Sequence, residues 1–333
     1  MVWLLIRFKT TSMKLRRLIN KTIAHIAICT FFVISGCDKE EDVVPVINDT
    51  ISGIILTSPE FSMLEALVAK ANLAITLDGP GPFTVFAPDD SAFAASGITL
   101  SLINSLTQQQ AQIILLYHTL NSKMLVADLP AGPNAKVTTF NGDSIFVTKN
   151  SSGAYINGVK ISQNDIAADN GTMHKIERVL NFPVGTIPQT VMVSGLDSLA
   201  KAIARATNDT TGDAGLTNVL NTVTITMFAP TDSAFINLLS ALSLTDINNI
   251  PVDTLVDILN YHITQGLIFS PDMVEGPLPM LGGGNTSINL TNGIDSGPTI
   301  TGAGNSGNAS NITTLNILSR NGVLHKIDRV LVP

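Results

Sequence analysis

The chain is poor in cysteine and in aromatic residues. Its 333 residues include two cysteines, Cys29 and Cys37. After Cys37 the sequence can therefore form neither a disulfide nor a thiolate metal site. Aromatic residues make up 5% of the chain, and the single tryptophan is Trp3. This scarcity argues against a dedicated glycan-binding platform of exposed aromatic rings.

Basic residues are also scarce beyond the N-terminus. Six of the 19 lysines and arginines lie within residues 1–36, which contain no acidic residue. The rest of the chain has 13 basic and 26 acidic residues, a net charge of −13. Such an acidic surface does not neutralise phosphates, so nucleic acid is excluded as a partner.

Apolar residues, by contrast, are plentiful. They make up 45% of the chain, whereas charged residues make up 14%. This composition supplies a buried core and excludes a disordered chain. At about 100–200 residues per domain, the length predicts two domains, or three.

The N-terminus has the pattern of a targeting segment. Four basic residues between positions 14 and 21 precede an apolar run at 23–34, which is too short for a comfortable transmembrane helix. The run ends in Ile34-Ser35-Gly36-Cys37, which resembles a bacterial lipobox. We therefore predict a lipoprotein signal peptide at residues 1–36, with Cys37 as the lipidated residue that would also carry palmitate. An ordinary secretory signal with an incidental cysteine is the alternative, and the start codon, Met1 or Met13, stays open.

A charged tether follows the cysteine, at residues 37–46. Its Asp38-Lys39-Glu40-Glu41-Asp42 segment resembles an export tag that sends lipoproteins to the outer surface of one group of Gram-negative bacteria. We therefore expect an outer-membrane lipoprotein exposed on the cell surface. The alternative is a solvated linker on a protein that faces the periplasm.

The remainder of the chain is an internal duplication. Eight of eleven residues are identical between Phe83–Phe93 and Ile225–Phe235. The offset between equivalent residues grows from 142 to 151 along the chain, so the period is that of a tandem domain. We predict domains at residues 47–183 and 184–333. Two further motifs recur in the same order: Tyr117-His118 as Tyr261-His262, and Asn170–Leu180 as Asn321–Leu331.

Each copy is predicted to be α+β, with helices packed on a curled antiparallel sheet that forms a sandwich or wedge. Asn141-Gly142 and Asn157-Gly158 are typical of hairpin turns. The Gly- and Asn-rich stretch 281–314 is expected to be a long loop. Expected helices are Phe61–Lys70, Gln108–Tyr117, Leu196–Ala206 and Thr254–Tyr261, and expected strands of the first copy are Lys136–Phe140, Ser144–Thr148, Ala154–Ile156, Val159–Ser162 and His174–Leu180.

The three repeated motifs together resemble those of the fasciclin domain, and the resemblance covers about residues 47–333. It implies a wedge-shaped β-sandwich with a helical layer, a location outside the cytoplasm and a role in adhesion. In animals, such domains bind integrins and matrix proteins, and the Tyr-His region is implicated. The candidate partner-binding residues are therefore Tyr117, His118, Tyr261 and His262. The family as a class has no enzyme activity, and we expect no cofactor.

The repeated histidines have two interpretations. His118 with His174, and His262 with His325, could form metal or acid/base sites with Asp90 or Asp232. A zinc site usually needs three or four ligands. We favour buried histidines that hydrogen-bond to backbone groups, because duplicated domains share structural motifs. No metal site is predicted.

The repeated aspartates also have two interpretations. Asp90 and Asp232 could act as a nucleophile or general base. Their positions just after Pro88 and Pro230 favour caps of a short helix instead. With no nucleophile elbow around the neighbouring serines, we predict structural roles for Asp90, His174, Asp232 and His325, no catalytic residue and no enzyme.

These observations predict a non-enzymatic, lipid-anchored surface protein. It would hold an unknown protein or polysaccharide of the cell surface or matrix, and would contact the membrane through its lipid. The contacts would come from loops and edge strands around the Tyr-His motifs and from residues 281–314. The alternative is a ligand-capture lipoprotein that serves a glycan-uptake system.

Overall fold

A computed structural model describes residues 49–208, 213–291, 293 and 297–333. The predicted signal peptide, Cys37 and the tether up to residue 46 lie outside the described residues. The described residues all belong to one compact unit. We call residues 49–183 the first copy and residues 184–333 the second copy; the boundary between them stays a prediction.

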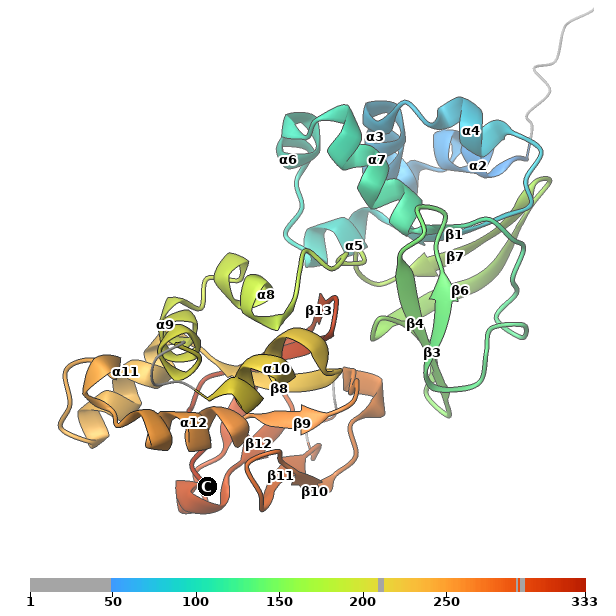
Figure 1. Cartoon of the computed structure of the whole chain (residues 1–333). Helices are drawn as coiled ribbons and strands as arrows, with labels where there is room; N and C mark the ends of the chain where they lie inside the picture. The colour runs from blue at the N-terminus through green and yellow to red at the C-terminus, as the bar shows by residue number, and fades with distance from the viewer. Residues whose placement is uncertain (1–48, 209–212, 292, 294–296) are drawn as a thin grey trace, which may run out of the picture. The chain divides into compact units, whose positions relative to one another are not determined.

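The first copy begins with helices and ends with strands (Figure 1). Its seven strands form one sheet in the order β2-β1-β7-β6-β5-β4-β3. The predicted helix over Gln108–Tyr117 is confirmed as α7. The elements are α2 (Ile51–Thr57), η1 (Pro59–Phe61), α3 (Ser62–Ala71), α4 (Ala74–Asp78), β1 (Phe83–Pro88), α5 (Asp90–Ala95), α6 (Leu100–Ser105), α7 (Gln108–Tyr117), β2 (Thr119–Leu120), β3 (Gly132–Thr138), β4 (Ser144–Asn150), β5 (Gly153–Ile156), β6 (Val159–Ala168) and β7 (Gly171–Ile176).

The second copy repeats this plan. Its sheet has the order β10-β11-β12-β13-β14-β8-β9. The elements are α8 (Ile187–Val193), α9 (Asp197–Ala206), α10 (Ala214–Thr222), β8 (Ile225–Pro230), α11 (Asp232–Ala241), η2 (Ile247–Asn249), α12 (Val252–Asn260), β9 (Ile263–Gln265), η3 (Ser270–Asp272), β10 (Gly276–Pro279), β11 (Asn285–Asn289), β12 (Thr299–Thr301), η4 (Ala303–Asn305), β13 (Ser310–Ser319) and β14 (Gly322–Ile327).

Each sheet is mixed, because one of its pairings is parallel. Strand β1 pairs with β7 in parallel, and β8 pairs with β14 in the same way. The sequence predicts a curled antiparallel sheet, and this parallel pair is the one departure from it among the described strands of each copy. A parallel pair needs a long crossover. Here the crossover contains the other five strands of the copy, together with the α-helices α5, α6 and α7 in the first copy and α11 and α12 in the second. The first and last motif strands thereby become neighbours, with only the short strand β2 or β9 between this pair and the edge of the sheet.

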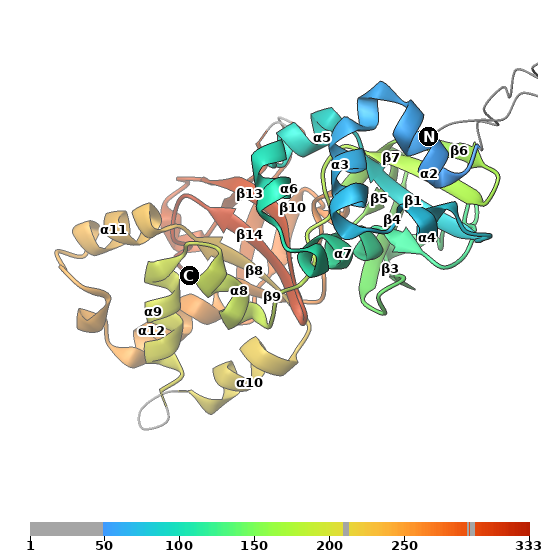
Figure 2. The same cartoon turned by 90° about the horizontal axis from the view of Figure 1, so that it is seen from above.

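Two hydrophobic cores lie on opposite faces of the parallel pair β1 and β7. Val85 and Met173 face the helices α2, α3, α4 and α7, which lie on one side of β1 and β7 in Figures 1 and 2. Phe86 and Ile176 face the interior of the curled sheet. The first sheet rolls up far enough for the Phe140 N–H to donate to the Thr119 carbonyl at 2.7 Å.

Local sequence explains several boundaries. Asn157 and Gly158 both have positive φ, at 50° and 77°, which makes the predicted hairpin turn between β5 and β6. Strand β7 ends at Ile176 and not at Leu180. The reason is that the Val179 and Leu180 amides leave the ladder to bond Ser96 and His118.

The expected loop over residues 281–314 contains three segments of strand and one 3-10 helix. Strands β11 and β12, the 3-10 helix η4 and the start of β13 lie within it. Its Gly and Asn residues favour turns, but Ile288, Ile300 and Ile312 alternate with polar residues and are buried. This period of two is typical of strands with one buried face.

No single helix in the described part of the chain is long and apolar enough to span a membrane. Taken together, the helices Ile51–Thr57 and Pro59–Ala71 have the length and composition of a span, but the pair is bent by 98°.

Candidate functional site

The Tyr-His motif ends the last helix of each copy, and its side chains point inward. Tyr117 and His118 have exposed fractions of 0% and 2%, and Tyr261 and His262 of 1% each. The Tyr117 hydroxyl donates to the Ser144 carbonyl at 3.0 Å and accepts from Asn157 at 2.9 Å. Burial raises the pKa of Tyr117. As folded, these four side chains offer no surface to a partner. Their direct binding to a partner remains a prediction.

His118 and His262 join the last helix of each copy to the chain after its last strand. Nδ1 of His118 lies 2.8 Å from the Ile114 carbonyl, and Nε2 accepts the Leu180 N–H at 2.8 Å. Nδ1 must therefore carry the proton. His262 repeats the arrangement with Ile258 and Leu331. Burial lowers the pKa of both imidazoles to about 4.

The histidine of the last strand secures the loop that follows the Tyr-His motif. We call residues 121–129 the first loop and residues 266–273, which include the 3-10 helix η3, the second loop. Nε2 of His174 lies 2.8 Å from the Met124 carbonyl in the first loop. Nε2 of His325 lies 2.8 Å from the Ile268 carbonyl in the second loop. Both nitrogens face a carbonyl, so both carry a proton and donate.

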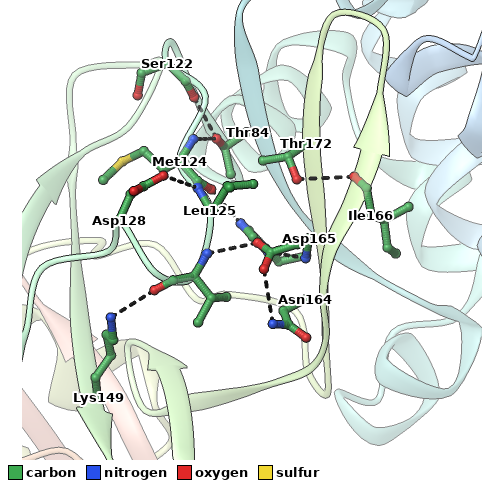
Figure 3. A network of polar contacts seen from close by, with 12 residues as sticks. Thr84, Ser122, Met124, Leu125, Asp128, Lys149, Asn164, Asp165, Ile166 and Thr172 are labelled. Carbon is green, nitrogen blue, oxygen red and sulfur yellow. Dashed lines mark hydrogen bonds and ion pairs between the residues drawn. The ribbon is translucent and has the colours of Figure 1, made fainter.

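Three further side chains fix the first loop (Figure 3). The Thr84 hydroxyl donates to the Ser122 carbonyl at 2.6 Å and accepts the Met124 N–H at 2.9 Å. Oδ1 of Asp165 accepts the Val126 N–H at 2.9 Å. The ammonium of Lys149 donates to the carbonyls of Val126, Ala127 and Leu129 at 2.9, 3.3 and 3.2 Å. Strands β1, β4 and β6 thus each supply one anchor.

The second loop has nearly the same anchors. Thr226 bonds the carbonyl of Gly266 and the amide of Ile268. Asn316 takes the place of Asp165, and its Oδ1 accepts the Ser270 N–H at 2.8 Å. Asp165 and Asn316 both have positive φ, at 58° and 63°. The two loops therefore share a backbone design but differ in one charge beside the histidine.

Exposure separates the two loops. Asn121, Ser122, Lys123, Leu125 and Asp128 of the first loop are exposed. In the second loop, Phe269 and Ser270 are buried. The Phe269 ring packs against the ring of Phe146 from β4, with centroids 5.8 Å apart, and Thr148 of the same strand bonds Asp272 at 3.0 Å. The first loop is accessible, whereas the second is covered by the first copy.

The histidines have no lone pair left for a metal. In each ring, one nitrogen donates to a carbonyl and the other accepts a backbone N–H. Within the described ranges, no group of three or more His, Cys, Asp or Glu residues could hold a metal ion. The chemistry of these rings is that of structural, neutral imidazoles.

Asp90 and Asp232 cap helices, but not the helices that the sequence predicts. The short helix α5 is capped by Asp89, and α11 by Thr231. Asp90 instead accepts from the Ser62 hydroxyl and the Met63 N–H at the start of α3. Asp232 accepts the Ser198 N–H of α9. The sequence could not predict this, because each cap comes from a segment about 30 residues away.

The Asn-Gly pair of the last motif also has a structural role. Asn170 accepts the Ile51 N–H and donates to the carbonyls of Leu77 and Gly79. A Cβ on Gly171 would lie 2.1 Å from the Phe83 carbonyl oxygen, so β1 and β7 can approach only if this residue is glycine. Asn321 and Gly322 repeat both features.

Sequence reasoning missed Thr84, Lys149 and Asp165 as loop anchors. Thr84 lies inside a repeated motif and recurs as Thr226, so the repeat could have pointed to it. Lys149 lies outside every repeated motif, and Asp165 is replaced by Asn316 in the second copy, so the repeat could point to neither.

Comparison with known proteins follows the repeat. Residues 59–183 and 201–333 each match the family model of the fasciclin domain. Transforming growth factor-beta-induced protein ig-h3 of Sus scrofa is 27% identical over 271 residues, 77% of this chain and 35% of that protein. Periostin of Homo sapiens is 28% identical over 270 residues, 77% of this chain and 29% of that protein. The chain spans about a third of the length of these two relatives.

A shorter protein and a solved structure are also similar to this chain. Protein sll1483 of Synechocystis sp. is 31% identical over 137 residues, 40% of this chain and 74% of that protein. A solved FAS1 domain pair from the insect cell adhesion molecule Fasciclin I is 19% identical and covers 81% of this chain and 95% of that chain, with a TM-score of 0.37. Because the family model matches more than half of the chain, in two successive stretches, the chain belongs to the fasciclin domain family and carries two tandem domains.

Proposed function

We propose that this chain is a non-enzymatic, lipid-anchored cell-surface protein that binds a protein or polysaccharide partner in adhesion or matrix assembly. The observation that supports this most is the first loop, which combines exposure with a fixed backbone. An ordered loop loses little conformational entropy on binding. Its exposed side chains are mixed: Lys123 is cationic, Leu125 is apolar and Asp128 is anionic.

A non-enzymatic role agrees with the use of the polar residues. The ring nitrogens of the four described histidines bond backbone groups. The carboxylates of Asp90 and Asp232 bond the N-terminal ends of helices. In this role, the buried Tyr-His motif is part of the core, and the first loop is held by Thr84, Lys149, Asp165 and His174. The partner contacts are then made by the loop residues that follow the motif.

Attachment of cells tests the role of the first loop. A strain without the gene would be complemented with the full chain, with a Lys123→Ala/Leu125→Ala variant, or with Ile75→Ala as a control. Ile75 is 88% exposed on α4 of the same copy. We expect the deletion and the loop variant to lower attachment at least about threefold and the control to retain it. Unchanged attachment in the deletion strain would refute the proposal.

The same complemented strain can be used to test the lipid anchor. We expect Cys37→Ser to abolish palmitate labelling and to release the protein from the membrane fraction, with loss of attachment. Protease added to intact cells should degrade the unaltered protein if it is displayed outward. Protection in intact cells, with degradation after lysis, would instead indicate a periplasm-facing protein.

A further inference from the structure

The first loop contains one feature that the second lacks, a carboxylate beside the histidine that holds it. Oδ1 of Asp165 lies 3.7 Å from Nδ1 of His174. At the same time, the Asp165 N–H donates to that Nδ1 at 3.1 Å, and Oδ1 accepts the Val126 N–H. Asp165 therefore contacts both the histidine and the loop.

Protonation of His174 reverses one of these hydrogen bonds. Nδ1 becomes a donor, so it can no longer accept the Asp165 N–H. The nearest charged acceptor is Oδ1 of Asp165, which is engaged with Val126. A charge-assisted bond from imidazolium to carboxylate is stronger than one from a neutral amide to the same carboxylate. The carboxylate is therefore drawn from the loop to the histidine.

We propose that His174 and Asp165 form an acid-operated latch, in which protonation of His174 transfers the Asp165 carboxylate from the Val126 amide to the imidazolium and loosens the first loop. The second loop has no such latch. Asn316 offers His325 a neutral amide, and its Nδ2 is already bonded to Ser270. The second loop therefore stays closed at the same pH.

The electrostatic surroundings of the two histidines agree with this difference. Burial lowers the pKa of His174, while the Met124 carbonyl and the Asp165 carboxylate both raise it. Burial lowers the pKa of His325 to about 4, and only the Ile268 carbonyl raises it. On acidification, His174 is therefore expected to bind its proton before His325.

The other groups around His174 do not replace Asp165. From β1, the neighbour is the Phe86 ring, which stacks on the imidazole with centroids 5.6 Å apart. Charged groups of the first loop and of the neighbouring strand β4 include Lys123, Asp128 and Lys149. Lys149 bonds loop carbonyls, and Asp128 accepts the Leu125 N–H. Lys175, next along β7, pairs with Glu60 and Asp89 on the opposite face.

Amide hydrogen exchange of the full chain, followed by NMR, tests the latch. After correction for the intrinsic pH dependence of exchange, we expect the Val126 amide to lose about tenfold in protection between pH 7.5 and pH 5.0. The Ser270 amide in the second loop should lose clearly less protection than the Val126 amide. Equal loss in both loops would overturn the proposal, because general acid destabilisation affects both.

Two variants isolate the carboxylate. Asp165→Asn keeps an oxygen for the Val126 N–H, as Asn316 does for Ser270, so its loop should stay protected at pH 5.0. Asp169→Asn removes a charge from an exposed residue near the same strand and should behave like the unaltered chain. An Asp165→Asn loop that opens as readily as the unaltered loop would overturn the proposal.

If the Asp165→Asn variant does not fold, an NMR titration of the histidine rings tests the latch in the unaltered chain. The ring resonances of the unaltered chain should show His174 titrating at a higher pH than His325, and the reverse order would overturn the latch. The role of the latch in regulating binding rests on the proposed function. The two proposals can be tested separately. Attachment of the Leu125→Ala variant at pH 7.5 tests the binding role while the latch is closed, and hydrogen exchange at Val126 tests the latch in the absence of a partner.

Discussion

Each of the four described histidines lies between one backbone donor and one backbone acceptor. That arrangement satisfies a neutral imidazole and fixes its tautomer: Nδ1 carries the proton in His118 and His262, and Nε2 carries it in His174 and His325. An imidazolium has two donors and no acceptor. Each histidine therefore stabilises the fold only while it is neutral.

This arrangement predicts a fold that weakens in mild acid. Burial holds the pKa of His118, His262 and His325 at about 4, whereas an unfolded histidine has a pKa of about 6.5. Between these values the unfolded chain binds more protons, so the free energy of unfolding falls as the pH is lowered. We expect a loss of about 2 kcal/mol for each of these histidines between pH 7.5 and 5.0.

Urea unfolding at the two pH values measures this loss. His118→Gln should unfold more readily at pH 7.5 but lose less on acidification than the unaltered chain, because one titrating group is gone. Equal free energies of unfolding at pH 7.5 and 5.0 would contradict the prediction.

At the scale of elements, the helices of the two copies depend on caps from distant residues. Helices α3 and α9 follow Phe61 and Leu196, neither of which can cap a helix with its side chain. Asp90 and Asp232 supply the missing acceptors from the helix after β1 or β8. The negative charge also interacts favourably with the N-terminal end of the helix dipole. The repeated Asp thus joins two helices in each copy.

Removal of these caps should destabilise the two copies unequally. Asp90 accepts two hydrogen bonds and Asp232 accepts one. We expect Asp90→Ala to cost about 2 kcal/mol and Asp232→Ala about 1 kcal/mol in the free energy of unfolding. Asp90→Asn should lose less than Asp90→Ala, and Asp169→Ala, an exposed control, should lose almost nothing. Urea unfolding measures all four, and equal losses for Asp90→Ala and Asp169→Ala would contradict the assignment.

At the scale of the whole molecule, the duplication has produced two loops of one backbone design and two different environments. Leu125 of the first loop and Phe269 of the second stand at the same place, since their amides bond Asp128 and Asp272 respectively. Leu125 is 38% exposed, whereas Phe269 is fully buried. One loop is thus part of the core, and the other remains available for contacts.

Alanine at these two positions should therefore have opposite effects. Phe269→Ala leaves a cavity and is expected to cost about 3–4 kcal/mol in the free energy of unfolding. Leu125→Ala removes an exposed side chain and should cost less than about 0.5 kcal/mol while lowering attachment. Urea unfolding and the attachment assay together measure this contrast. A large stability loss for Leu125→Ala would place that side chain in the core and contradict its assignment to a contact surface.

The sequence by itself determined the duplication, the family, the α+β class and many of the elements. Repeated identical residues and hydrophobic periodicity are local signals, and they are enough to locate α7, the β5–β6 hairpin and the motif strands. The sequence also marked His174, Asn170 and Gly171 as important. It could not say why, because their partners Met124, Ile51 and Phe83 lie between 50 and 119 residues away or across the sheet.

Only the tertiary structure decided which residues are available for contacts. The parallel pairing of β1 with β7 brings Thr84 and His174 to the same loop. The residues of the Tyr-His motif are buried, whereas residues that follow it in the loop are exposed. The antiparallel pairing of β6 with β7, whose register shifts between Gln163 and Ile166, places Asp165 between a histidine and an amide. These are long-range relations of burial and charge, and no local pattern of residue types encodes them.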